Sequence, residues 1–212
     1  MDTVLGVSMA PSTVRMVLVE GDNGDGATVE QDDFALPGNG DATLPSAPEQ
    51  VVSAILGTRE GAAEGGYQLA STGVTWTDQL EAAALRDALA ARKIENVMLV
   101  SAFLAAAALA QSVGSANGYG RTGLLFVEPD AATTAIVDSA DGSVVEARRE
   151  PFTSGDPAAE LAAMVGDMQT LESRPDGLFL IGSGVDVGPL KPQLEATTSL
   201  PVSAPEEPAT AL

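Results

Sequence analysis

The sequence reads TVLGVSMAPST at residues 3–13 and LLFVEPDAATT at residues 124–134. Each stretch begins with an apolar run typical of a buried strand and continues into small, turn-forming residues. Beginning with these strands, both halves are expected to have the same order of elements: three strands, a helix, a strand, a helix, a strand and a helix. Such a repeat predicts two similar α/β lobes, with the functional site in the cleft between them.

The first half predicts a lobe over residues 1–116. We expect its strands at residues 3–8, 13–20, 28–34, 67–75 and 97–100. The first helix runs from Pro48 to Leu56, where Ser46 caps it and Gly57–Gly66 ends it. Thr77 caps a second helix at 78–93, and a third covers 102–112. The Gly, Pro, Asn, Asp and Ser residues of 37–48 predict a surface loop.

The second half predicts a lobe over residues 121–212, joined to the first by the Gly-rich segment 115–120. Its strands are expected at residues 123–127, 133–138, 143–151, 178–181 and 200–203. Asp156 caps a helix that starts at Pro157, and a short helix covers 189–196. A last helix begins near Glu206, and the chain ends within it, which suggests a domain cut from a longer protein.

Charge narrows the choice of partner. Thirty Asp and Glu residues against ten Lys and Arg give a formal net charge of −20 at pH 7. Such a chain repels phosphate backbones, so we expect neither nucleic acid nor an anionic membrane surface as its partner. A basic protein surface suits it better.

The sequence contains no cysteine and no histidine. This excludes disulfides, thiol nucleophiles, Ser-His triads, imidazole bases and the usual zinc sites. Met1-Asp2 leads directly into a strand without a signal-like segment, and the most apolar stretch, Val97 to Ala110, is too short to span a membrane. We therefore expect a cytoplasmic protein.

The order of strands and helices is that of the ribonuclease H-like unit, and two such units in tandem give the architecture of actin and of Hsp70 ATPase domains. Several motifs resemble that superfamily. Residues 6–17 are similar to its first phosphate loop, particularly the version in actin-like pilus assembly proteins, and residues 106–110 to the alanine-rich connecting helix of Hsp70. Residues 126–137 occupy the position of the second phosphate loop. Residues 180–184 resemble the strand and turn near the adenosine, and residues 205–212 the start of the closing helix.

The resemblance extends over nearly the whole chain, and it is to domains of the kind found at the N-terminus of actinobacterial, especially mycobacterial, proteins of uncharacterised function. It implies an α/β fold of two tandem ribonuclease H-like lobes, an actin/Hsp70-like core with reduced or absent outer subdomains. ATP or ADP with Mg²⁺ would bind at the positions that match the phosphate and adenosine loops. These are Ser8, Ser12, Thr13, Glu128, Asp130, Thr133, Gly182, Ser183 and Gly184.

Departures from the family pattern predict a protein that does not hydrolyse ATP efficiently. Active members carry a magnesium-organising Asp where Ser8 stands and a Gly where Ala10 stands, and Pro11 removes a further amide donor. The second loop keeps an acid and a threonine but no glycine, and the place of the water-aligning acid falls near Phe103. We expect a catalytically degenerate domain that acts as a protein-binding or regulatory module, with an unidentified protein partner, no cofactor, no metal and no catalytic residue.

Two alternatives stay open. The first is a nucleotide-binding switch or weak ATPase that uses the inter-lobe cleft, with Glu128 or Asp130 in place of the lost aspartate. The second is a nuclease of the ribonuclease H type, which needs several carboxylates around two metal ions, although Ser8 stands where the first would be. Homodimers are common in the resembling family, and the sequence leaves the oligomeric state open.

Overall fold

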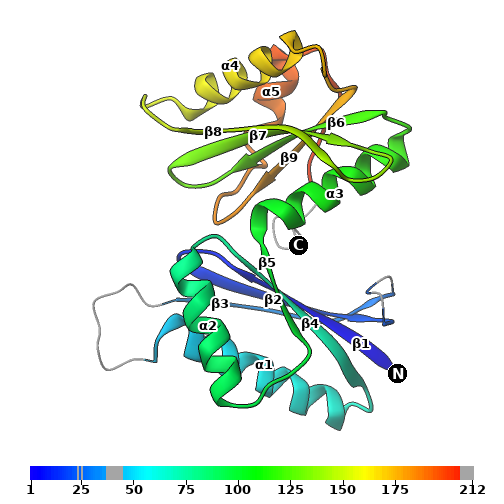
Figure 1. Cartoon of the computed structure of the whole chain (residues 1–212), viewed down its shortest axis with the longest axis vertical. Helices are drawn as coiled ribbons and strands as arrows, with labels where there is room; N and C mark the ends of the chain where they lie inside the picture. Colours follow the sequence, from blue (N-terminus) through cyan, green and yellow to red (C-terminus); the bar gives the residue numbers. More distant parts are fainter. Residues whose placement is uncertain (23, 25, 37–44, 206–212) are drawn as a thin grey trace. The chain divides into compact units, whose positions relative to one another are not determined.

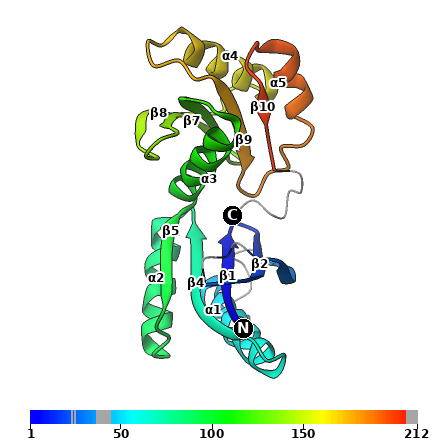
Figure 2. The same ribbon diagram turned by 90° about the vertical axis from the view of Figure 1, so that its right-hand side faces the viewer.

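A computed structural model describes residues 1–22, 24, 26–36 and 45–205. These residues form two compact units, 1–102 and 103–205. Each unit is built on one five-stranded mixed sheet with helices packed on it (Figures 1 and 2). None of the described helices is long and apolar enough to cross a bilayer.

The first unit has the strand order β3-β2-β1-β4-β5. β1 pairs antiparallel with β2 and parallel with β4. The strands are β1 (Asp2–Met9), β2 (Thr13–Glu20), β3 (Thr28–Ala35), β4 (Gln68–Trp76) and β5 (Val97–Ser101). Helices α1 (Ala47–Glu64) and α2 (Gln79–Ala91) cover one face of the sheet, as Figure 1 shows. Their buried faces meet alternate strand residues in a core that includes Leu5, Val7, Val52, Ile55, Val74 and Leu85.

The second unit repeats this arrangement with the order β10-β9-β6-β7-β8. β6 pairs antiparallel with β7 and parallel with β9. The strands are β6 (Arg121–Val127), β7 (Ala131–Asp138), β8 (Val144–Pro151), β9 (Gly177–Gly182) and β10 (Val202–Ser203). Its helices are α3 (Ala102–Asn117), α4 (Pro157–Thr170) and α5 (Lys191–Thr197). α4 packs through Leu161, Met164, Val165 and Met168 on the apolar face of the sheet.

These two sheets confirm the predicted fold class, two tandem α/β lobes of ribonuclease H-like order. No further helix or strand lies in the described parts of the links between β3 and α1 and between β8 and α4. The expected loop at 37–48 lies mostly outside the described residues, and the last helix from Glu206 lies wholly outside them.

Two helix ends of the first unit differ from the sequence prediction. α1 continues through Gly57 and Gly61 to Glu64, because Ala62 is buried beyond them and packing outweighs the poor helix propensity of glycine. α2 is capped by Asp78, not Thr77, since the Asp78 carboxylate accepts the N–H groups of Leu80 and Glu81. Ser46 and Asp156 stand at the N-caps of α1 and α4 as predicted.

α3 was expected to complete the first lobe, with the seam at residues 115–120. The structure groups its residues from Phe103 onward with the second unit. Its Ser115 hydroxyl donates to the Ser139 carbonyl at 2.7 Å, and Phe103 stacks edge-on against Phe126 with ring centroids 6.3 Å apart. Gly114 lets α3 lie close to Thr122 of β6 and to Ser139, which follows β7, and this close approach groups the helix with the second sheet.

Candidate functional site

The two hairpins expected to approach phosphate have the same backbone framework, one in each unit. Ala10 N–H donates to the Thr13 carbonyl at 3.0 Å, and Glu128 N–H donates to the Ala131 carbonyl at 2.8 Å. Each hairpin therefore turns through two residues, Pro-Ser at 11–12 and Pro-Asp at 129–130. Because proline has no N–H, each loop tip offers only one backbone donor.

Each turn is also hydrogen-bonded to the residue that follows the neighbouring strand, β3 in the first unit and β8 in the second. The Ser12 carbonyl accepts the Leu36 N–H at 2.8 Å, and the Asp130 carbonyl accepts the Phe152 N–H at 2.9 Å. These bonds hold the turns closed against the sheet. A wide, glycine-rich loop that wraps a phosphate with several amides is incompatible with this geometry.

In the first unit, Ser8, Ser12 and Thr13 lie at the end of β1 and in the turn that follows it. Ser12 is exposed, whereas Ser8 and Thr13 are half-buried. Ser8 pairs in parallel register with Thr75 of β4. The Thr75 hydroxyl oxygen is buried and has no hydrogen-bond partner among the described residues.

In the second unit, an arginine on β8 binds both predicted acids. Arg149 Nε and Nη2 each lie 3.0 Å from Glu128 Oε2, and Nη2 lies 3.9 Å from Asp130 Oδ1. Only 16% of the Glu128 side chain is exposed, so this carboxylate depends on the arginine more than a solvated acid would. Thr133 is buried on β7 directly opposite Arg149.

The turn at residues 182–184 lies beside the Glu128 hairpin. Val127 and Gly182 are paired at the ends of parallel strands β6 and β9, and the Ser183 N–H donates to the Val127 carbonyl at 2.8 Å. Gly182 has no room for a side chain, because a Cβ there would lie 2.3 Å from the Val185 carbonyl oxygen. Gly184 has a φ of 69°, which favours glycine.

The structure thus brings the six predicted residues of the second unit together where β6 and β9 end and β7 begins. The three of the first unit lie at the corresponding strand ends of the other sheet, where β1 ends and β2 begins. Sequence reasoning missed Arg149 and Thr75. The Asp141-Gly142 hairpin sets the β7–β8 register and could have placed Arg149 near the acids. No sequence signal marks the unpaired hydroxyl of Thr75.

The residues present do not fit the magnesium–phosphate centre that the fold family implies. Among the described residues, no group of three or more metal-ligating side chains is positioned to hold an ion. Arg149 is paired closely with Glu128 and more distantly with Asp130, and a proline removes an amide from each tip. The arrangement can present a hydroxyl or a single amide to a ligand, but no phosphoryl-transfer step follows from it.

Comparison with known proteins agrees with the fold. The chain resembles the ethanolamine utilization protein EutJ from Carboxydothermus hydrogenoformans, with a TM-score of 0.60 and 13% identity over 98% of this chain and 86% of that one. It also resembles the activator of 2-hydroxyisocaproyl-CoA dehydratase from Clostridium difficile with bound ADPNP, with a TM-score of 0.61 and 9% identity over 99% and 90% of the two chains.

A third similar structure is the PilM-PilN type IV pilus biogenesis complex, with a TM-score of 0.60 and 12% identity over 99% of this chain and 89% of that one. At such low identities these likenesses establish the actin-like ATPase fold and nothing about chemistry. No curated protein matches the sequence. The sequence model of one protein family, described as a family of unknown function (DUF7159), matches residues 2–212.

Proposed function

Because the chain belongs to DUF7159, a family of unknown function, we propose its role from its own residues: an actin/Hsp70-like domain without phosphoryl-transfer catalysis that serves as a protein-binding or regulatory module. One observation carries this proposal. Arg149 is paired with the two acids that would have to hold magnesium, while the turn that bears them is closed by hydrogen bonds. A retained fold with this loop geometry favours a scaffold over an ATPase.

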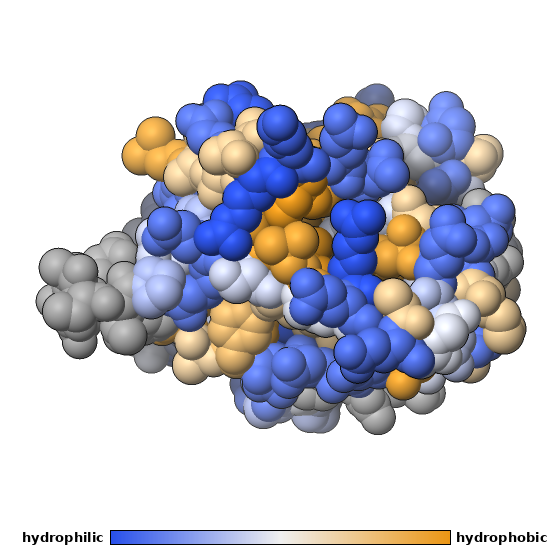
Figure 3. Space-filling model, turned by 90° about the horizontal axis from the view of Figure 1, so that it is seen from below, coloured by the Kyte–Doolittle hydropathy of each residue, from blue (hydrophilic) through white to orange (hydrophobic). Residues whose placement is uncertain are grey.

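The partner in this proposal is a protein with a basic surface. The net charge of −20 attracts such a surface and repels nucleic acid. Large apolar side chains that are more than half exposed include Leu80 and Met98. Figure 3 shows one face of the molecule, on which apolar side chains gather between strongly hydrophilic ones. Clustered apolar surface with a polar rim is typical of protein contacts.

The proposal includes a cytoplasmic location, where the absence of cysteine, and hence of disulfides, is ordinary. It leaves the oligomeric state to measurement by sedimentation. A homodimer would carry each partner-binding surface twice, but the proposed protein-binding function does not require dimerisation.

Calorimetric titration of the purified chain with ATP and with ADP, each with and without Mg²⁺, tests the proposal. We expect no saturable heat at millimolar nucleotide and no release of phosphate. Tight magnesium-dependent binding together with turnover would refute the module hypothesis. Binding without turnover would replace it with the nucleotide switch described next.

A nucleotide-binding switch is the second candidate, and Thr75 favours it. A buried hydroxyl without a partner costs free energy unless a ligand or water satisfies it. Thr75 stands in register with Ser8, at the strand end where the fold family places phosphate. If the switch exists, Thr75→Val and Ser8→Ala should weaken nucleotide binding at least tenfold, whereas unchanged affinity would count against it.

A further inference from the structure

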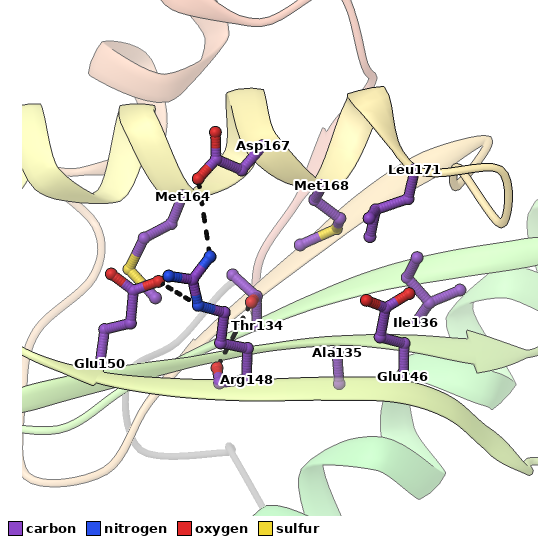
Figure 4. A pocket seen from close by; sticks show the side chains of 10 residues that line it. All are labelled: Thr134, Ala135, Ile136, Glu146, Arg148, Glu150, Met164, Asp167, Met168 and Leu171. Carbon is purple, nitrogen blue, oxygen red and sulfur yellow. Dashed lines mark hydrogen bonds and ion pairs between the residues drawn. The ribbon is translucent and has the colours of Figure 1, made fainter.

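A groove lies between α4 and the edge strand β8 of the second unit. Figure 4 shows its lining, and its cavity has a volume of about 60 Å³. One wall is apolar and contains Ile136, Met164, Met168 and Leu171. The other wall carries the charged side chains of Glu146, Arg148 and Glu150, which project from β8 toward α4.

Arg148 crosses this groove. Its Nε lies 2.7 Å from Glu150 Oε1, and its Nη1 lies 3.8 Å from Asp167 Oδ2 on α4. The arginine side chain is 65% exposed, and ion pairs in such surroundings contribute about 0–1 kcal/mol. A ligand that supplies its own cation to Glu150 and Asp167 can therefore displace Arg148 at little cost.

As an edge strand, β8 also presents backbone groups that pair with no other described strand. In an antiparallel ladder only alternate residues bond to the neighbouring strand. The Phe152 N–H donates to the Asp130 carbonyl, so the residues of β8 that bond to β7 include Glu150 and Arg148. Ala147 and Arg149 lie between these positions and direct their N–H and C=O groups to the outer side of the sheet.

We propose that this groove binds an extended, basic peptide segment of a partner protein, which adds to β8 as a further strand. One apolar side chain of the segment would enter the cavity, against the adaptable thioethers of Met164 and Met168. Because strand side chains alternate, the residues two positions before and after it lie on the same side. Lys or Arg there would pair with carboxylates of the groove, which has Glu146, Glu150 and Asp167 against one arginine.

The charged side chains of β8 that line the groove also restrict which segment can pair with this strand. Charged side chains on an edge strand oppose indiscriminate pairing, so a partner has to match them to bind. The expected pattern is basic-x-apolar-x-basic. This inference rests on the proposed protein-binding function and adds to it a place and a partner chemistry.

Selection of random heptapeptides displayed on phage against the whole chain tests the inference. Enriched peptides should carry the basic-x-apolar-x-basic pattern. Their affinity, measured by fluorescence polarisation, should fall at least tenfold for Ala147→Pro, which removes one outward N–H and no ladder bond. Gln31→Pro is the matched control, because Gln31 has the same outward position on β3 of the first unit.

Glu146→Lys is a second variant that leaves the backbone unchanged, and it should weaken binding of the same peptides at least threefold. The groove is refuted if no peptide is enriched, if the enriched peptides are acidic, or if Ala147→Pro binds them normally. If the protein forms a dimer and Ala147→Pro dissociates it, the groove binds a second copy of the chain. That result would also refute the proposal of a peptide partner. Nucleotide turnover would instead refute the proposed function, so the two failures are distinguishable.

Discussion

Arg149 binds both acids of the second hairpin, with its Nη2 3.0 Å from Glu128 Oε2 and 3.9 Å from Asp130 Oδ1. In the first hairpin the positions equivalent to these acids are Ala10 and Ser12, so that turn requires no cation. The two turns share their hydrogen-bond framework but differ in charge. The two units therefore share a closed two-residue turn, and only the turn of the second unit carries acids, which are paired with an arginine.

Replacing Arg149 should destabilise the second unit. In Arg149→Gln, the largely buried Glu128 carboxylate loses its partner, and we expect the free energy of unfolding to fall by about 1 kcal/mol, a value discounted for the exposure of the arginine. Urea denaturation measures the change. Arg86→Gln is the control, because its pair with Asp87 is exposed on both sides and should contribute nothing measurable. Equal effects for the two variants would contradict the role given to Arg149.

The framework was predictable from the sequence because alternating apolar residues and turn signals determine it. The strands on either side of Pro11 and Pro129 follow from those patterns. The end of α1 was not predictable, since glycines at 57 and 61 read as a helix end until the burial of Ala62 is known. The candidate site was predictable only as a set of loop positions. The Arg149 ion pairs depend on the register between β7 and β8, which brings Arg149 next to acids about twenty residues earlier in the sequence.

Gly114 should tolerate no side chain. A Cβ at this position of α3 would lie 2.0 Å from Thr122 Oγ1 and 2.3 Å from Ser139 Oγ, so α3 would have to move away from the sheet. We expect Gly114→Ala to lower the free energy of unfolding by about 1–3 kcal/mol. Gly166→Ala in α4 meets nothing within 4 Å and should raise it by about 0.5–1 kcal/mol. A neutral Gly114→Ala would show that α3 does not pack as described.

Asp78, not Thr77, should be the cap that α2 needs. Asp78→Ala removes the acceptor of the Leu80 and Glu81 N–H groups, at 2.7 Å and 3.0 Å, and should cost about 1 kcal/mol. Thr77→Ala is the neighbouring control and should leave stability within about 0.5 kcal/mol of the original. Thermal unfolding followed by circular dichroism compares the two. A larger loss for Thr77→Ala would reverse the assignment.

The Glu81 carboxyl provides a second readout of the same cap. Burial raises its pKa, and the nearby charge of Asp78 raises it further. Asp78→Ala should therefore lower the pKa of Glu81, which an NMR titration of the side-chain carboxyl would detect. If the pKa stayed the same, the two carboxylates would not be near enough to interact.

Thr75→Val should stabilise the first unit if no ligand uses its hydroxyl. The methyl group fills the same space, and a buried oxygen without a hydrogen-bond partner is removed. We expect a gain of about 1 kcal/mol in the free energy of unfolding. A loss of similar size would mean that an ordered water or bound ligand satisfies the hydroxyl. That result would direct attention to the nucleotide switch.

Glu160 should make the second unit less stable to unfolding at acidic pH. Hydrogen bonding by Ser154, and then by Thr153, lowers the pKa of its carboxyl below the usual value. A carboxyl whose folded pKa is lowered stabilises the fold above its unfolded pKa, and this contribution disappears as the pH falls through the folded pKa. Glu160→Gln should thus be less stable than the original at about pH 7, and the difference should shrink toward about pH 3. Because Glu160 ties the loop before α4 to that helix, a difference that stayed constant with pH would mean that packing, not charge, anchors the loop.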